Sequence, residues 1–402
     1  MTFPKRALRK EALASGKYSK AAWPTLAVLG SLVVVFANSF GIFRFGLYVL
    51  FGLLLILPFF NKFTTWKNPS INMPGLAFIY FSLISTAFHS ATPTSVYNGT
   101  IAALSMAVLL SLVASAPKES DFRRFIRQMS IVARILLLFG LVLILSDLPF
   151  IWNTQTGFLF CLLVFILINE KIKPRKKMMY IVVWFVQSYL IDDRAYLIAG
   201  VVFGIAYLVL PVLSRRLWLG KTLLLVFLGL LILVPVFYVQ LSTSVHRTYL
   251  DELALTYTGG RFFSGRDIIW NSLINDYLAG NILIGGGHDI GTSVLYGNTL
   301  SSHNTYVAVL TRMGFLGLVA FFAVFYGLLK SYLSHIEHKI VRVSAAATLA
   351  LLFKQSTEFS LIGNNIAHSL FSWLVMSLGV IFINSKLRSS ATNHSEVLIK
   401  KV

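Results

Sequence analysis

Long apolar runs, each close to 20 residues, alternate with short polar connections along almost the whole chain. A helix of that length crosses the ~30 Å hydrocarbon core of a membrane. The pattern therefore predicts an all-α polytopic membrane protein with about 12 transmembrane helices. The expected spans are 23–41, 45–60, 71–90, 98–116, 129–147, 150–169, 178–191, 195–213, 222–240, 303–329, 343–362 and 365–384.

The polar segments divide the chain unevenly. Residues 1–22 form a basic tail, 23–384 a single transmembrane domain and 385–402 a second polar tail. One connection is far longer than the others, because about 241–302 separates the ninth expected span from the tenth. Internal repeats are not evident. Polar groups that could carry chemistry are concentrated in this long segment, since the remainder reads as hydrocarbon-soluble helix.

Composition and charge support the membrane interpretation and fix an orientation. The chain is 56% hydrophobic and 12% charged, whereas soluble domains carry about 25% charged residues. Of its 35 lysines and arginines, 27 fall in the tails and connections on the side of the N-terminus. Such a bias predicts that both termini are cytoplasmic and that 241–302 is extracytoplasmic. The net charge of +20 therefore reflects topology and contact with the lipid bilayer, and does not predict a nucleic-acid partner.

The sequence Ser264-Gly265-Arg266-Asp267 within the long segment is typical of a helix start. Ser264 would be the N-cap, with Asp267 completing a pattern like a capping box. Apolar residues then recur at helical spacing up to Gly280, a natural stop. Arg266 would lie at the N-terminal end of this helix, where backbone N–H groups favour an anion such as a diphosphate. The alternative is an ordinary surface helix with Arg266 paired to a carboxylate.

Charged residues also follow the seventh expected span directly. That span, 178–191, has 14 residues and a length of about 21 Å at 1.5 Å per residue, short of the membrane core. Asp192, Asp193 and Arg194 should then lie at or slightly below the outer face, where ionisable groups are usually functional. Arg194 is thus a second candidate anion ligand. The alternative is a tight connection in which the two aspartates neutralise it.

Ionisable groups near the last three spans complete the candidates. His303 opens the tenth span at the membrane boundary, where an imidazole could accept a proton, although a backbone-satisfied histidine is equally common there. Arg312, nine residues on, should face the opposite side of that helix. Lys354 and Glu358 are spaced i,i+4 in the eleventh span and are expected to form a structural ion pair, with a lipid-phosphate path as the other possibility.

Several other chemistries lack their sequence signatures. The run Gly285-Gly286-Gly287 lacks P-loop spacing, and His288 beside it is expected to be structural. Metal-ligand spacings and a rhomboid-like Gly-x-Ser-Gly are absent from the sequence. Asp192 and Asp193 could hold a divalent ion on a diphosphate, but Arg194 makes a metal-free clamp simpler. The single cysteine, Cys161, excludes an intrachain disulfide. We therefore expect no metal and no cofactor.

Taken in order, the motifs of the late spans resemble the O-antigen ligase and polysaccharide polymerase family of bacterial membranes. The resemblance covers about residues 190–320, and the earlier spans match only in number and topology. The motifs are Ile191-Asp192-Asp193-Arg194-Ala195, Ser264-Gly265-Arg266-Asp267-Ile268-Ile269-Trp270, Ile284-Gly285-Gly286-Gly287, Ser302-His303-Asn304-Thr305-Tyr306 and Met313-Gly314-Phe315-Leu316-Gly317-Leu318.

The resemblance implies a GT-C-like fold in the bacterial cytoplasmic (inner) membrane and glycosyl transfer on its extracytoplasmic face. A glycan would move from undecaprenyl diphosphate to a hydroxyl of lipid A-core, for a ligase, or of a second lipid-linked glycan, for a polymerase. Carried over, Arg194 and Arg266 would hold the diphosphate, and His303 would be the general base. Arg261 is a secondary diphosphate ligand. The sequence places no obvious carboxylate beside His303.

A different class, a transporter or flippase of lipid-linked glycans, is the main alternative. Transporters of this size typically show internal repeats and binding sites near the midplane of the membrane. The concentration of polar residues in one asymmetric external segment favours the enzyme.

Overall fold

The computed structural model falls into two compact units, one of 64–114 with 193–380 and the other formed by the rest of the chain. All the predicted site residues belong to the first of these, which we call the site unit. The residues that the structure describes are 68–89, 93–146, 155–191, 193–258, 261–263, 265–288, 292–295, 298–362 and 366–400.

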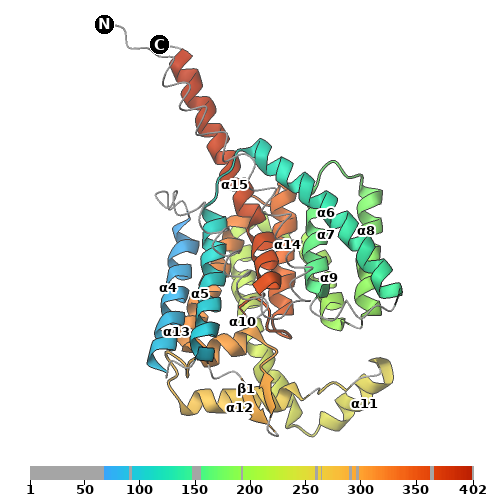
Figure 1. Cartoon of the computed structure of the whole chain (residues 1–402), viewed down its shortest axis with the longest axis vertical. Coiled ribbons are helices and arrows are strands. Elements are labelled where there is room, and N and C mark those ends of the chain that lie inside the picture. Colours follow the sequence, from blue (N-terminus) through green and yellow to red (C-terminus); the bar gives the residue numbers. More distant parts are fainter. Residues whose placement is uncertain are drawn as a thin grey trace. The chain divides into compact units, whose positions relative to one another are not determined.

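Helices make up most of both units (Figure 1). The site unit contains α4 (Pro69–Phe88), α5 (Pro93–Ala114), α9 (Arg194–Ser214), α10 (Leu217–Ser242), α11 (Arg247–Thr258), α12 (Arg266–Ala279), α13 (Thr305–Leu333), α14 (Lys339–Lys354) and the beginning of α15 (Ile366–Lys400). The other unit contains α6 (Glu119–Leu145), α7 (Gln155–Ile168), α8 (Pro174–Leu190) and the end of α15.

The helices identify the chain as a helical membrane protein. Among the described residues, seven helices are long and apolar enough to cross a membrane: α4, α5, α6, α9, α10, α13 and α15. Each of the ten predicted spans within the described part coincides with a helix, and α7, α8 and α14 are the shorter ones at 14, 17 and 16 residues. The first two predicted spans, 23–41 and 45–60, lie outside the described residues.

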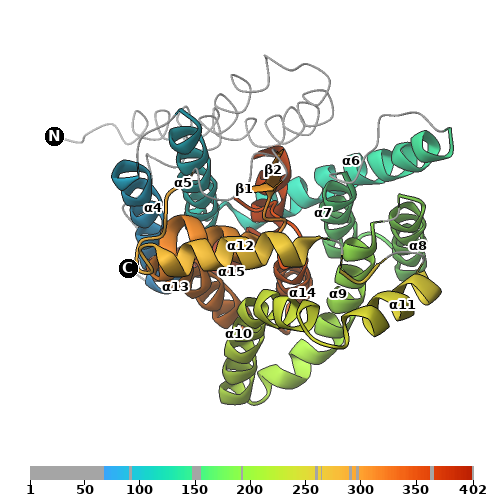
Figure 2. The same ribbon diagram turned by 90° about the horizontal axis from the view of Figure 1, so that it is seen from below.

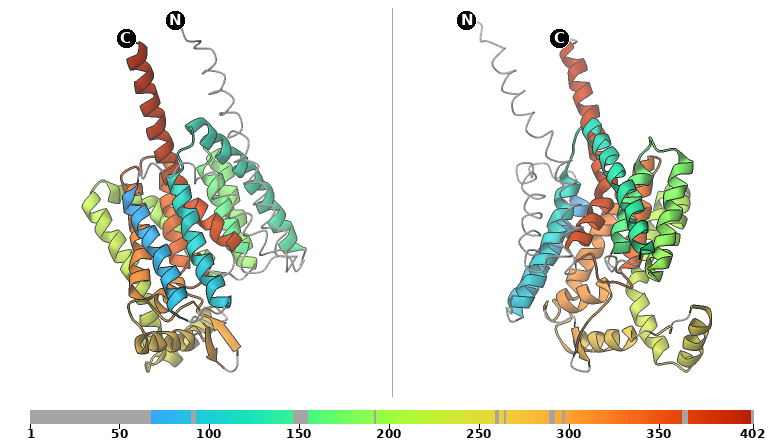
Figure 3. Two further views of the ribbon diagram at one scale, coloured as in Figure 1. Left: turned by 60° about the vertical axis from the view of Figure 1, so that its left-hand side comes forward. Right: turned by 45° about the vertical axis from the view of Figure 1, so that its right-hand side comes forward.

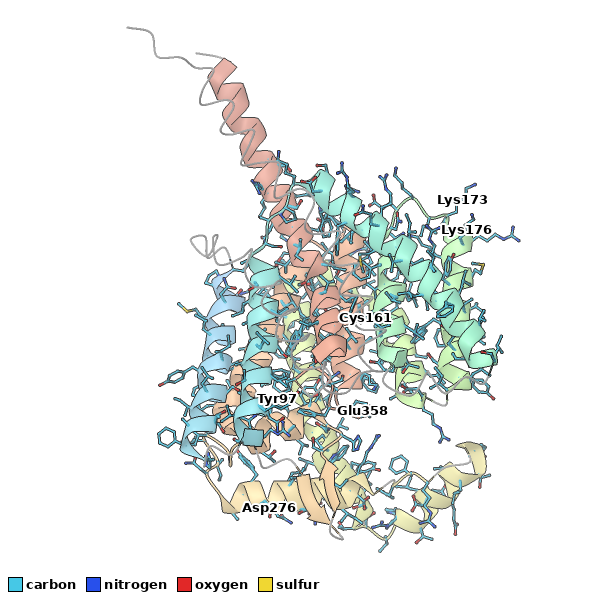
Figure 4. All side chains as sticks on the ribbon, viewed as in Figure 1. Tyr97, Cys161, Lys173, Lys176, Asp276 and Glu358 are labelled. Atoms are coloured by element: carbon cyan, nitrogen blue, oxygen red, sulfur yellow. The ribbon has the colours of Figure 1, made fainter. Side chains whose placement is uncertain are left out.

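Several predicted span limits are wrong. Helix α6 begins at Glu119 rather than at 129, and α5 begins at Pro93 rather than at 98. Helix α8 begins at Pro174 rather than at 178, because proline is favoured in the first turn of a helix, so the span is longer than the expected 14 residues. Its Lys177 is inside the helix, where Nζ donates to the carbonyl of Leu167 at 2.6 Å. Figure 4 shows Lys173 and Lys176 at this N-terminal end of α8. Helix α14 ends at Lys354 rather than at 362.

Helix α13 is the centre of the site unit and is broken at Gly314. It packs against α4, α10 and α12, and Gly314 has φ 70° and ψ −171°. The segment between α12 and α13 supplies hydrogen bonds at the break: Gly286 N–H donates to the Thr311 carbonyl at 2.8 Å, and Phe315 N–H donates to the Ile282 carbonyl at 2.9 Å. In an unbroken helix Phe315 would donate to Thr311 itself. The glycines at 285–287 therefore lie against the backbone of α13.

Substituting Gly314 by alanine should destabilise the protein by about 1–3 kcal/mol or more, because a side chain is strained at this φ. In addition, the added Cβ would lie 2.3 Å from the Leu283 carbonyl oxygen. Thermal unfolding in detergent micelles measures the loss. The matched control is Gly204→Ala in α9, where the Cβ would meet nothing within 4 Å. Equal melting of Gly314→Ala and Gly204→Ala would contradict the account of the break.

The long segment between α10 and α13 folds into a layer across the ends of the helices of the site unit. Helix α12 packs on α10, on α13 and on the strand β1, and Figure 2 shows it crossing in front of α13. A short antiparallel hairpin of β1 (Thr292–Leu295) and β2 (Asn298–Ser301), which was not predicted, lies beside α12 (Figure 3). The predicted helix that starts at Arg266 and stops before Gly280 is confirmed.

Candidate functional site

A carboxylate that the sequence analysis assigned to a structural pair lies at the centre of the candidate site. Glu358 Oε1 is 3.7 Å from Arg266 Nη2 and 3.9 Å from Lys354 Nζ. Glu358 Oε2 is 3.9 Å from His303 Nδ1. Arg266 and His303, both predicted site residues, thus meet at one partly exposed carboxylate. Figure 4 shows Glu358 at the end of the spans that faces the layer carrying Asp276 of α12.

Glu358 lies in a turn, rather than on the helix where it was expected. The side chain of Gln355 holds this turn: its Oε1 accepts from the backbone N–H groups of Ser360 and Leu361, at 3.1 Å each, and from Thr305 Oγ1 at 2.6 Å. Thr305 Oγ1 also contacts the carbonyl of Glu358 at 3.2 Å. These hydrogen bonds replace those that a longer α14 would make, so the helix ends at Lys354. They also fix the Glu358 backbone to the start of α13.

His303 precedes α13 instead of opening it. The N-cap is Asn304, whose Oδ1 accepts from Tyr306 N–H at 2.8 Å and from Val307 N–H at 3.0 Å, while its Nδ2 donates to the Ser356 carbonyl at 2.7 Å. His303 itself has φ 46°, a left-handed conformation that is uncommon outside glycine. The backbone of His303 is thus held in an uncommon conformation next to an anchored cap.

Arg266 lies in the first turn of α12, as predicted, but it is the first residue of the helix and the cap differs. The N-cap is Gly265, with φ 84° and no side-chain hydrogen bond, so the prediction of Ser264 as the cap is wrong; Ser264 itself lies outside the described residues. Asp267 does not cap the helix. It is buried, and its carboxylate pairs with Arg247 Nη2 at 3.3 Å.

One contact joins α12 to the turn that holds His303. The indole N–H of Trp270 donates to the Ser302 carbonyl at 2.6 Å. The Trp270 ring also packs on Tyr238 of α10, with centroids 5.0 Å apart. The first turn of α12, which carries Arg266, is thereby fixed relative to His303.

Arg194 begins α9, whose N-terminal turn lies beside the cluster. Asp193 caps this helix by accepting from Tyr196 N–H at 3.2 Å. The Tyr196 ring in turn lies under the Lys354 ammonium, with Nζ 4.3 Å from the ring centroid. The Arg194 side chain is exposed. Asp192, the other predicted neighbour, lies outside the described residues.

Not every predicted group joins the cluster. Within the described part of the chain, the ion pairs of Glu358 involve neither Arg194 nor Arg261, and the Arg261 side chain is exposed. Arg312 was expected on the side of its helix opposite His303, but it lies close to the cluster. Its guanidinium lies 4.8 Å from the ring centroid of Phe359, the residue after Glu358.

His288 is packed between the helices instead of lying at the site. Its Nε2 is 3.1 Å from Ser82 Oγ in α4, and its carbonyl accepts from Asn98 Nδ2 in α5 at 3.3 Å. Burial, together with the nearby Arg312, lowers the pKa of His288 to about 3. A neutral, buried imidazole in this position supports the expected structural role.

The electrostatics of the cluster favour an anion. Burial alone would raise the pKa of Glu358. His303, Lys354 and Arg266 lower it by more than burial raises it, so the pKa lies below its usual range. Glu358 is therefore ionised at neutral pH. Its negative charge and that of Asp193, which acts on Lys354, face three cations, Arg266, Lys354 and Arg194. Among the described residues of the cluster, positive charge therefore remains in excess. A multiply charged anion such as a diphosphate suits this excess.

The cluster combines one carboxylate with several cations, and it is not a set of metal ligands. Among the residues that the structure describes, three or more His, Cys, Asp or Glu side chains do not gather in a way that could hold a metal ion. Glu358 is the carboxylate nearest the candidate base, and its other neighbours in the cluster are cations.

Sequence reasoning missed Glu358 as a partner of His303. The i,i+4 spacing from Lys354 drew attention to the residue, but a helix through 362 would have kept it on the face of a span. Comparisons of the sequence add no assignment: no family model matches the chain, and no curated protein matches it significantly.

Proposed function

We propose that the protein is a membrane glycosyltransferase that moves a glycan from undecaprenyl diphosphate to an acceptor hydroxyl. The proposal includes a GT-C-like arrangement of about 12 spans, both termini in the cytoplasm and a site on the extracytoplasmic face of the bacterial inner membrane. The motifs at 190–320, the bias in lysine and arginine and the ten helices that coincide with predicted spans support it.

The convergence of Arg266 and His303 on Glu358 is the observation that carries the proposal. The three residues come from the start of α12, the turn before α13 and the turn after α14. Hydrogen bonds made by Trp270, Asn304 and Thr305 join these three backbone segments. A purely structural ion pair would not need a boundary histidine in a left-handed conformation. An anion-binding arginine beside a proton acceptor is what transfer from a diphosphate requires.

The transfer would proceed as a single displacement. The acceptor hydroxyl oxygen attacks the anomeric carbon, its proton passes to Nε2 of His303, and the bond from that carbon to the diphosphate oxygen breaks. Arg194 and Arg266 stabilise the negative charge that develops on the departing undecaprenyl diphosphate. The anomeric centre is inverted, and no carboxylate nucleophile is needed, in contrast to retaining hydrolysis.

The acceptor distinguishes two versions of the activity, and reconstitution separates them. Purified protein in proteoliposomes is given undecaprenyl-diphosphate glycan with and without lipid A-core. A ladder of longer lipid-linked glycans without the core identifies a polymerase, and transfer only with the core identifies a ligase. Failure of both reactions would overturn the proposal. If the wild type and His303→Ala instead move intact donor across the bilayer equally well, the protein is a flippase.

A further inference from the structure

We propose that Glu358 is a positioning residue with two alternating partners. Before the donor binds, Glu358 neutralises Arg266. When the donor diphosphate takes Arg266, Glu358 orients the His303 ring through Nδ1–H, which favours the tautomer whose unprotonated Nε2 accepts the proton of the acceptor hydroxyl. This inference rests on the proposed glycosyl transfer and adds a link between donor binding and the readiness of the base.

The two oxygens of Glu358 already face different partners. Oε1 lies 3.7 Å from Arg266 Nη2, whereas Oε2 lies 3.9 Å from His303 Nδ1. Both distances exceed those of a charge-assisted hydrogen bond, about 2.7–2.9 Å. Neither contact is closed in this structure, so a small side-chain movement can tighten one at the expense of the other.

The backbone around the carboxylate is fixed, so such movement is confined to side chains. Thr305 Oγ1 contacts the Glu358 carbonyl, and Asn304 Nδ2 donates to the Ser356 carbonyl in the same turn. His303 directly precedes Asn304, so the base and its partner are carried by two mutually bonded turns. Arg266 belongs to a separate helix, and its long side chain is the part most free to change partners.

Charge determines which partner Arg266 prefers. A diphosphate offers several oxygens and more negative charge than one carboxylate, and an arginine can contact two of the oxygens at once. Once Arg266 has turned to the donor, Glu358 keeps Lys354, its remaining cation, and His303. An imidazole that donates Nδ1–H to a carboxylate is held in the tautomer with a free Nε2.

Other charged and aromatic groups around the cluster do not offer a substitute carboxylate. From α9, Asp193 caps its own helix, and Tyr196 lies against Lys354. From α13, the guanidinium of Arg312 stacks on Phe359. Asp267 of α12 is paired with Arg247. Glu358 is thus the carboxylate within reach of His303 among the described residues.

The test is Glu358→Gln, which keeps the size and the polar character of the side chain but removes its charge. We expect kcat for glycan transfer to fall by about 10²-fold, since the base loses its orientation. The KM for undecaprenyl-diphosphate glycan should stay the same or fall, because a competitor for Arg266 is gone. Glu358→Asp, which restores a shorter carboxylate, should recover part of kcat. The matched control is Glu252→Gln on the exposed surface of α11, which should behave as the wild type.

Two results would overturn the inference. One is a kcat of Glu358→Gln equal to that of the wild type. The other is a KM that rises while kcat falls, with no recovery in Glu358→Asp, which would assign Glu358 to holding the turn alone. Binding of undecaprenyl diphosphate, followed by tryptophan fluorescence without turnover, measures the predicted change in affinity independently. Failure of the proposed function would look different, because the wild type itself would then transfer no glycan to either acceptor.

Discussion

Replacing His303 by alanine should lower glycan transfer by about 10²–10⁴-fold, the range that a general base contributes. Without the imidazole, the acceptor hydroxyl must lose its proton to water during the attack. Donor binding should change little, since the diphosphate contacts belong to the arginines. The measurement is the initial rate of transfer from undecaprenyl-diphosphate glycan by purified protein, at donor concentrations that saturate the wild type.

His246, in the segment between α10 and α13, provides the control for that variant. His246 is exposed just before α11 and outside the cluster, so His246→Ala should transfer at the wild-type rate. Both variants should elute as one species and melt at similar temperatures. If His303→Ala and His246→Ala are equally active, His303 is not the base.

Replacing Arg266 or Arg194 by alanine should each reduce transfer by about 10²–10³-fold, the typical cost of removing one group that stabilises developing negative charge. Arg266→Lys should also be poor, because lysine cannot make the bidentate contact to two phosphate oxygens. The loss should appear in kcat/KM, and binding of undecaprenyl diphosphate should weaken in parallel. Initial rates across a range of donor concentrations measure both.

Arg215 is the matched control for the arginine variants, because it is exposed at the opposite end of α9 from Arg194. Arg215→Ala should keep wild-type kinetics. Full activity of either Arg266→Ala or Arg194→Ala, in protein that remains folded in the membrane, would rule out a clamp that needs both arginines.

Local sequence signals were sufficient for the helices and for half of the cluster. Apolar runs predicted a helix at every expected span in the described residues, and the pattern around Arg266 predicted the start of α12. These features depend on neighbours within a few turns, where periodicity and capping preferences act. Arg266 and His303 could therefore be selected before their positions in space were known.

The position of Glu358 could not be predicted because it depends on contacts distant in sequence. Helix α14 ends where Gln355 bonds to Thr305, 50 residues earlier in the chain. Similarly, the capping pattern suggested that Asp267 would stay at its own helix end, but Arg247 of α11 takes it into an ion pair. Long-range hydrogen bonds and charge pairs of this kind override local preferences.

The hydrogen bonds at the α13 break also depend on residues distant in sequence, so they could not be predicted. The glycines at 285–287 and 314 are part of the motifs in the sequence. That Gly286 replaces Phe315 as the donor to the Thr311 carbonyl follows only from the fold.

Release of undecaprenyl diphosphate is the most direct test of the proposed glycan transfer with His303 as the general base. Purified wild-type protein and His303→Ala are each incubated in proteoliposomes with undecaprenyl-diphosphate glycan, with either a second lipid-linked glycan or lipid A-core as the acceptor. The account predicts that the wild type releases one undecaprenyl diphosphate for each glycan transferred and that His303→Ala releases almost none. No release by the wild type with either acceptor, or equal release by both proteins, would contradict it.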